Sequence, residues 1–302
     1  MSGSSDEYLE KALSEYNAKV NGLEPAGDSE DLLEAYVNRG CILSMMEHYT
    51  SALDDLQAAS EIESRIGSDD GTYVKMKTEL GKLYSHFGTD PQEIYSDASA
   101  RLRWIHPSSR HFDAKKIVGM CLESADILLE FSHTQDCIPY LDKALESTGS
   151  KIDPWMRNRR MEAFNLLGEV YDTEDNAEKA AECYTESADI GLDLMGSGKL
   201  EDIELLAATF MARAECNLDL GLMDRFVEDS DRAVTMIEKM HDDGKLEDLK
   251  EASEICNNVA SEFIKQGRIK EAEAYLMKAV KLTLKGAQDY IDRQEKTDSD
   301  AL

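Results

Sequence analysis

The apolar residues between positions 162 and 190 recur at the spacing expected for two helices that pack against each other. One face of the first helix is formed at offsets 0, 3, 4 and 7 by Phe164, Leu167, Gly168 and Tyr171. A polar break at 172–176 follows, and the matching stripe of the next helix consists of Ala180, Tyr184 and Ala188. This stretch therefore predicts one antiparallel helix hairpin.

The same spacing recurs along the chain, with a small residue in each first helix at the point where two helix axes would approach. These small residues are Gly40, Gly81, Ala125, Gly168, Ala214 and Ala260. They predict six hairpins that turn at about residues 47, 89, 134, 174, 222 and 267, without a β-sheet. The second hairpin needs a one-residue slip. The fifth also fits poorly, because Phe226 and Ser230 stand where Ala and an aromatic residue are preferred.

The pentapeptide GKLED gives independent evidence of repetition. It occurs at 198–202 and 244–248, and this offset of 46 residues equals the offset from Ala214 to Ala260. The steps between successive hairpins are 41, 44, 43, 46 and 46 residues. Before the first hairpin, an amphipathic stretch at 6–20 predicts a helix that caps the array, and a turn-rich linker follows at 22–30.

The central hairpin resembles a tetratricopeptide repeat, whose signature is W-x2-L-G-x2-Y, then A-x3-F, then P. Phe164 stands in place of the Trp, Tyr184 stands in place of the Phe, and the closing Pro is absent. The resemblance covers about residues 30 to 285, with a longer period than the roughly 34 residues of the standard repeat. It implies an all-α fold, a right-handed α-solenoid of about six antiparallel hairpins with an N-terminal capping helix. The expected domains are a capping helix and linker at 1–29, a solenoid at 30–294 and an acidic disordered tail at 295–302.

The charge balance narrows the range of partners. The chain has 62 acidic and 33 basic residues and a net charge of -29, which would repel a polyphosphate, so nucleic acid is not expected as the main partner. No run approaches the roughly 18 to 20 apolar residues of a membrane span, and the first residues lack the regions of a signal peptide. We therefore expect a cytoplasmic protein without a membrane partner. The six cysteines stand singly in helical patterns, which predicts reduced core residues.

Motifs for catalysis, phosphate binding or metal binding are missing from the sequence. There is no GxxxxGK[ST], no HExxH and no EF-hand series. Two histidines and two serines at 106–111 invite a hydrolytic interpretation, but a polar turn with helix caps explains them better. The acidic segments at 69–71 and 298–300 lack the alternating spacing of a calcium loop. The sequence predicts no enzyme, no cofactor and no metal site.

In tetratricopeptide repeat proteins the first helices line a concave groove, so the resemblance places ligand-facing residues three before and one after each small residue. On this register, and one turn further on, the expected peptide-binding residues are Asp126, Asn165, Glu169, Asp172, Met211, Glu215 and Asn257. An Asn side chain offers a donor and an acceptor to an extended peptide, and the carboxylates favour a basic one. The set of Lys and Asn residues with which some relatives hold chaperone C-termini is missing.

The resemblance thus implies a non-catalytic scaffold that binds a basic peptide segment of another protein in a concave acidic groove. The alternative is a regulatory sensor, in which a peptide or small ligand changes the shape of the superhelix. Small-angle scattering separates the two, because only the sensor should become more compact when its ligand is added.

Two further surfaces are candidates for contact with another chain. Basic residues surround both tryptophans, and an edge interface could be formed by Arg103, Trp104, Trp155 and Arg159. The alternative is that each Trp packs under its own loop while the Arg residues pair with carboxylates. The last helix carries an apolar stripe that either covers the end of the stack or meets a second chain, so monomer and homodimer both stay open: Leu276, Val280, Leu284, Ala287 and Ile291.

Overall fold

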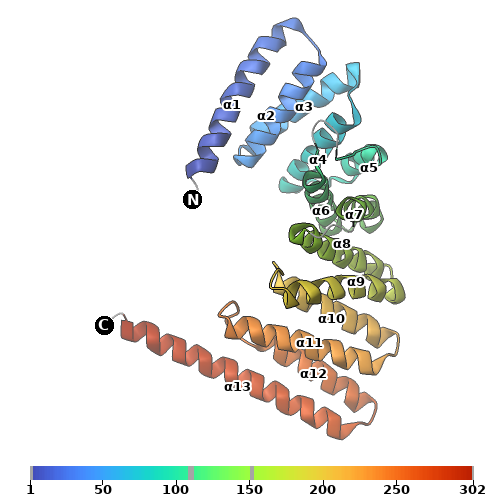
Figure 1. The fold of residues 1–302 in the computed structure, drawn as a ribbon, viewed down its shortest axis with the longest axis vertical. Coiled ribbons are helices and arrows are strands. Elements are labelled where there is room, and N and C mark those ends of the chain that lie inside the picture. The colour runs from blue at the N-terminus through green and yellow to red at the C-terminus, as the bar shows by residue number, and fades with distance from the viewer. Residues whose placement is uncertain (1–2, 108–111, 150–152, 301–302) are drawn as a thin grey trace. The chain divides into compact units, whose positions relative to one another are not determined.

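A computed structural model of the chain describes residues 3–107, 112–149 and 153–300. Within these ranges it consists of thirteen α-helices and one short 3-10 helix, with no β-strand. The chain divides into two compact units, unit 1 at Met1–Ser150 and unit 2 at Lys151–Leu302. Inside each unit, successive helices form antiparallel pairs (Figure 1). The predicted all-α helical repeat fold is therefore confirmed.

Unit 1 contains a capping helix and three hairpins. Its elements are α1 (Gly3–Leu23), the 3-10 helix η1 (Glu24–Ala26), α2 (Glu30–Met45), α3 (Tyr49–Ile66), α4 (Asp70–His86), α5 (Gln92–Leu102), α6 (Ala114–Glu130) and α7 (Thr134–Thr148). Val20 of α1 is fully buried in the same core as Leu33 of α2. Since an end hairpin would otherwise leave apolar side chains in water, α1 caps the first hairpin.

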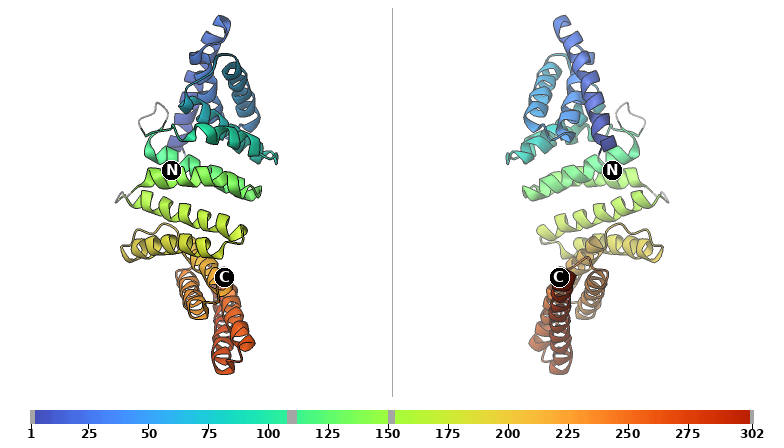
Figure 2. Two further views of the ribbon diagram at one scale, coloured as in Figure 1. Left: turned by 90° about the vertical axis from the view of Figure 1, so that its right-hand side faces the viewer. Right: turned by 90° about the vertical axis from the view of Figure 1, so that its left-hand side faces the viewer.

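Unit 2 contains the other three hairpins, which Figure 2 shows from two further sides. They are formed by α8 (Pro154–Thr173), α9 (Ala177–Gly196), α10 (Ile203–Asp219), α11 (Met223–Asp242), α12 (Lys250–Lys265) and α13 (Ile269–Asp300). All six predicted turns fall at the breaks between the two helices of a hairpin, to within one residue.

The six hairpins turn with the same backbone geometry. One tip residue in each has a positive φ between 57° and 74°, namely Glu47, Gly88, Ser132, Asp175, Gly221 and Gly267. The N–H of the following residue donates to the carbonyl five residues earlier, as from Thr89 to Tyr84 at 2.8 Å. These bonds form the Schellman motif, which satisfies carbonyl groups at the end of a helix. The tips are therefore alike in structure even where they differ in sequence.

The small residues lie at the close crossing of the two helices in a hairpin, as predicted. A Cβ atom added at Gly168 would stand 2.6 Å from Cε1 of Tyr184, and one added at Gly81 would stand 2.5 Å from Cζ of Tyr95. Both tyrosine rings come from the second helix and are buried. Each glycine therefore makes room for a large core side chain of its own hairpin.

The two GKLED segments occupy equivalent connections in unit 2, one after α9 and one after α11. Gly198 and Gly244 have φ values of 68° and 73°. The lysine that follows each glycine donates its N–H at 2.8 Å, to the carbonyl of Leu194 in one case and of Met240 in the other. The repeat seen in the sequence thus corresponds to a repeat in the backbone.

The last helix is longer than the sequence pattern suggested. α13 has 32 residues and continues to Asp300, so the predicted boundary at residue 294 lies inside a helix. Residues 287–300 contain no Gly or Pro that would end it. Most of the segment expected to be a disordered tail is therefore helical, and α13 runs well past the 16 residues of α12 (Figure 1).

Candidate functional site

Six of the seven predicted groove residues lie on the first helices of unit 2: Asn165, Glu169 and Asp172 on α8, Met211 and Glu215 on α10, and Asn257 on α12. α8 and α10 are neighbours, since the Cys216 thiol donates to Oδ1 of Asp172 at 3.6 Å. Burial raises the pKa of Glu215, and the carboxylates of Asp172 and Asp219 raise this pKa further. Acidic groups from two consecutive hairpins therefore lie close enough to repel one another. We call the surface formed by these six residues of α8, α10 and α12 the first-helix face.

Asn165 has a structural partner on this face. Its Nδ2 donates to Oγ1 of Thr209 at 3.0 Å, which ties α8 to α10. Thr209 is buried, and its hydroxyl donates to the carbonyl of Leu205 at 2.7 Å. Asn165 thus helps to hold the two acidic helices in register, and its direct contact with a peptide stays a prediction.

The seventh predicted residue, Asp126, lies on α6 in unit 1, where the first helices differ. Nζ of Lys82 stands 2.6 Å from Oε1 of Glu123, so an ion pair joins α4 to α6. The groove positions Val37 and Thr78 are buried under their neighbours. In unit 1 two of the groove positions are therefore buried, and a lysine and a glutamate of the first helices form an ion pair. One groove through both units stays a prediction.

The four residues of the predicted edge interface also divide between the units, with Arg103 and Trp104 in unit 1 and Trp155 and Arg159 in unit 2. Trp104 is exposed, and the Arg103 guanidinium lies 5.0 Å from its ring centre. Arg159 instead pairs with two carboxylates, of Glu162 at 2.7 Å and of Glu201 at 2.8 Å. The ion pairs of Arg159 therefore give it a structural role. A single surface formed by all four residues stays a prediction.

The other chemical candidates gain no support. Most of the 106–111 cluster lies outside the residues that the structure describes. In the described part of the chain, no group of three or more His, Cys, Asp or Glu side chains could hold a metal ion. No helix there is long and apolar enough to cross a membrane.

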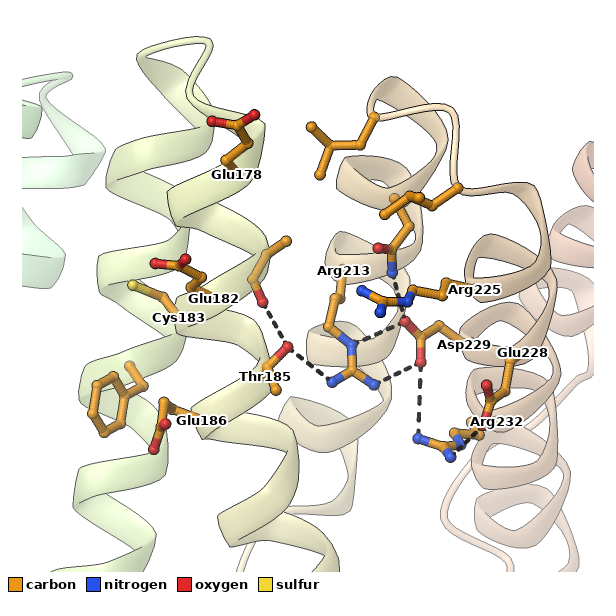
Figure 3. A pocket seen from close by; sticks show the side chains of 15 residues that line it. Glu178, Glu182, Cys183, Thr185, Glu186, Arg213, Arg225, Glu228, Asp229 and Arg232 are labelled. Carbon is orange, nitrogen blue, oxygen red and sulfur yellow. Dashed lines mark hydrogen bonds and ion pairs between the residues drawn. The ribbon is translucent and has the colours of Figure 1, made fainter.

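The structure contains a cleft that the sequence did not reveal, with a volume of about 860 Å³, between α9 and α11 (Figure 3). One wall carries a row of carboxylates at four-residue spacing on α9: Glu178, Glu182 and Glu186. The opposite wall on α11 carries both signs of charge: Arg225, Glu228, Asp229 and Arg232. The cleft is thus acidic along one side and of mixed charge along the other, where Arg232 pairs with Glu228 at 2.6 Å.

The floor of the cleft is a buried ion pair. Nε of Arg213 on α10 donates to Oδ2 of Asp229 on α11 at 2.9 Å, and its Nη2 donates to Oδ1 at 2.6 Å. Asn217 donates to the same carboxylate at 3.0 Å, and Nη1 of Arg213 reaches Oγ1 of Thr185 on α9 at 3.3 Å. This arginine clamp therefore joins three helices of unit 2, as the dashed lines in Figure 3 show.

The first hairpin has the same clamp. Arg39 binds both carboxylate oxygens of Asp55 at 2.6 and 2.7 Å, and 16 residues separate the partners, as they do in Arg213 and Asp229. In both hairpins the arginine stands directly before the small residue. In the fifth hairpin the clamp adds to apolar packing, because Phe226 of α11 lies in one core cluster with Ala214 of α10. The shared spacing was present in the sequence and could have revealed it.

The cleft and the first-helix face lie on different sides of α10. Arg213 and Glu215 are two residues apart, which separates their side chains by about 200° around a helix of 3.6 residues per turn. Arg213 points into the cleft, so Glu215 points away from it. Unit 2 therefore has two separate charged surfaces.

A scan of protein families identifies the hairpins. The tetratricopeptide repeat family model matches residues 162–190 and 253–285, which belong to the fourth and sixth hairpins. The chain contains tetratricopeptide repeats. Its repeats are long, since equivalent small residues are 41 to 46 residues apart. No sequence among the curated proteins matches this chain.

One solved structure supports this fold, and two others are more weakly similar. The chain is similar to BtubC (BKLC) from P. vanneervenii, with 17% identity, a TM-score of 0.53, and coverage of 78% of this chain and 90% of the other. It is also similar to the apo form of RapI, with 12% identity, a TM-score of 0.48, and coverage of 85% and 98%. For MamA the identity is 15%, the TM-score is 0.46, and the coverage is 67% and 96%.

The reactivity of Cys183 can report on the charge of the acidic wall of the cleft. Cys183 lies within this wall and is the one described cysteine that is not fully buried. Burial raises the pKa of the Cys183 thiol to about 11, and the carboxylates of Glu182 and Glu186 contribute. We expect E182Q/E186Q to lower this pKa and to speed alkylation of Cys183 a few-fold near pH 8, because only the thiolate reacts. Mass spectrometry after iodoacetamide treatment measures the rate.

Glu178→Gln is the matched control for this prediction, since Glu178 lies in the same row but does not contribute to the pKa of Cys183. Its rate should equal that of the wild type. An unchanged rate in the double variant would show that burial alone sets the reactivity of the thiol.

Proposed function

We propose that this protein is a non-catalytic interaction scaffold, and that the first-helix face of unit 2 binds a basic peptide segment of a partner protein. The observation that supports this best is the raised pKa of Glu215, to which burial contributes most and Asp172 and Asp219 contribute further. Crowded carboxylates disfavour their own charged forms, and a cation placed among them relieves the repulsion. A Lys or Arg side chain would therefore bind here more favourably than a neutral or acidic one.

The same face can hold more than one residue of a peptide. A segment that crosses α8, α10 and α12 would meet Glu169, then Glu215, and then the exposed amide of Asn257, which can pair with a peptide backbone. The bond from Asn165 to Thr209 fixes the spacing of the first two helices. The net charge of -29 would also hasten the approach of a basic partner.

The cleft between α9 and α11 is a second surface that would accept a basic segment. Its three carboxylates are about 6 Å apart along α9, which is close to the spacing of alternate residues in an extended chain. Arg225 on the opposite wall opposes this use, because its guanidinium would repel the same cations, whereas Arg232 already pairs with Glu228 at 2.6 Å. We therefore favour the first-helix face and use the cleft as the control surface.

Affinity for a lysine-rich peptide should fall as the pH is lowered, and the fall should begin above 4.5, the ordinary pKa of a glutamic acid. Glu215 has a raised pKa, so it takes up a proton at a higher pH than an ordinary glutamate and then offers no charge to the peptide. Fluorescence anisotropy of a labelled peptide between about pH 5 and 8 measures the change.

Two variants decide whether Glu215 causes this pH dependence. Glu215→Gln should bind the peptide more weakly near pH 7 and show a flatter pH profile. Glu204→Gln removes an exposed carboxylate near the start of the same helix, and its profile should match the wild type. A wild-type affinity that does not change over this range would contradict the proposed site.

A further inference from the structure

α13 exposes an unusual share of the apolar surface of the protein. Within the described residues fourteen large hydrophobic side chains are exposed, and α13 carries seven of them: Ile269, Leu276, Met277, Val280, Leu284, Tyr290 and Ile291. Leu284 is 64% exposed and Val280 is 53% exposed. The opposite face of the helix, with Ala272, Ala279 and Leu282, is the part that packs into unit 2. The stripe therefore does not cover the end of the stack.

The order of residues along this stripe is symmetric. Leu276 and Leu284 stand four residues on either side of Val280, and Ile269 and Ile291 stand eleven residues on either side. Offsets of 4 and 11 lie on one seam of a helix that pairs with another helix. In a two-fold interface each residue meets the residue at the mirrored position of the second copy. From this we propose that α13 joins two copies of the chain as an antiparallel homodimer centred on Val280.

The pairing joins like side chains. Val280 meets its own copy at the two-fold axis, Leu276 meets Leu284, and Ile269 meets Ile291. At the offset of seven residues, Glu273 faces Ala287, whose small side chain leaves the carboxylate room to reach the rim of the interface. No other described segment presents an exposed apolar stripe of this length, so the surface that best complements the stripe is the stripe of a second copy.

Size and charge both permit this association. Burying most of the exposed side-chain area of the seven residues on two copies removes roughly 1,200 Å² from water, which reaches the lower end of the range for specific interfaces. Residues 269–291 contain four lysines and three acidic residues, a net charge of +1 in a chain whose total is -29. The dimer therefore forms at the place where repulsion between two acidic copies is weakest.

Sedimentation of the full chain over a hundredfold concentration range tests the proposal. The wild type should sediment as a dimer that dissociates on dilution. Leu284→Glu should be monomeric throughout, with unchanged helical circular dichroism, because Leu284 packs little within its own chain. Ile66→Glu, a matched change of an exposed aliphatic residue in unit 1, should remain dimeric. A monomeric wild type, or a dimer that persists in the Leu284 variant, overturns the proposal.

Disulfide trapping tests the register and does not depend on the effect of a buried charge. In a Cys183→Ser background, Val280→Cys should form a covalent dimer under mild oxidation, because residue 280 meets its own copy. Leu284→Cys alone should not, since its two copies stand about 12 Å apart along the axes. A mixture of Leu276→Cys and Leu284→Cys chains should cross-link. Equal cross-linking by Leu284→Cys alone would overturn the antiparallel pairing.

Discussion

Asp229→Ala should lower the free energy of unfolding of unit 2 by about 3 to 5 kcal/mol, because it leaves a buried guanidinium without its carboxylate. The side chains of Arg213 and Asp229 are 10% and 5% exposed, so water cannot replace the lost partner. Asn217 also loses the oxygen to which it donates at 3.0 Å. Urea unfolding followed by circular dichroism measures the loss.

Three comparisons show whether the lost ion pair causes this effect. Asp224→Ala removes an exposed carboxylate from the same helix and should change stability by no more than about 0.5 kcal/mol. Asp55→Ala breaks the equivalent clamp of the first hairpin and should destabilise unit 1 in the same way. Arg213→Met with Asp229→Leu removes both charges and should recover much of the loss. If Asp229→Ala costs less than about 1 kcal/mol, the clamp is not a main support of the fifth hairpin.

Gly168→Ala should destabilise the fourth hairpin by about 1 to 3 kcal/mol, even though alanine is the better helix former. The new methyl group would stand 2.6 Å from the ring of Tyr184, which is buried and cannot move aside without disturbing its neighbours. The overpacking therefore outweighs the gain of roughly 1 kcal/mol in helix propensity.

Gly119→Ala in α6 is the matched control for this substitution, since no heavy atom lies within 4 Å of the added methyl group. Here the helix propensity acts alone, and the variant should be more stable than the wild type by up to about 1 kcal/mol. Thermal unfolding of the two variants should therefore shift in opposite directions. A stabilised Gly168→Ala would mean that the two helices do not cross as closely as described.

The fold could be predicted from the sequence because one physical requirement recurs six times. Gly81 and Gly168 had to be small to admit a tyrosine ring, and this requirement fixed the register of both helices in a hairpin. Turn chemistry alone was less informative. Glycine marks three of the six left-handed tip positions, whereas Glu47, Ser132 and Asp175 occupy the others. The Schellman hydrogen bonds at those tips tolerate a residue that a search for glycine would miss.

The cleft could not be predicted, because its lining comes from four helices and depends on how neighbouring hairpins stack. The clamp was missed for a different reason. The apolar template searched only for small and apolar residues, whereas the two helices of the fifth hairpin are also joined by Arg213 and Asp229. Along α13 the stripe was visible, but only the structure revealed that Leu282 and not Leu284 faces the core.

Because the chain divides into two units, residues at equivalent positions of the sequence repeat need not belong to one site. Asp126 and Glu169 occupy equivalent positions in consecutive repeats, yet they belong to different units. The neighbours Asp172 and Glu215, in contrast, are brought together inside unit 2, where Asp172 raises the pKa of Glu215. The candidate site therefore rests on these contacts between α8 and α10. Whether Asp126 contributes to peptide binding is tested separately by the single variant Asp126→Lys.

Binding of a labelled lysine- and arginine-rich peptide to two charge-matched variants tests the proposed function most directly. E169K/E215K reverses the first-helix face, and E178K/E182K makes the same change in net charge on the wall of the cleft. Wild-type affinity should fall as ionic strength rises from about 0.05 to 0.5 M, because the Debye length shrinks from above 10 Å towards about 4 Å. At the lower salt concentration, E169K/E215K should bind at least about tenfold more weakly, the equivalent of one lost interaction of 1.4 kcal/mol, while E178K/E182K should stay close to the wild type. Equal weakening by both variants, or a larger loss in E178K/E182K, would contradict binding at the first-helix face.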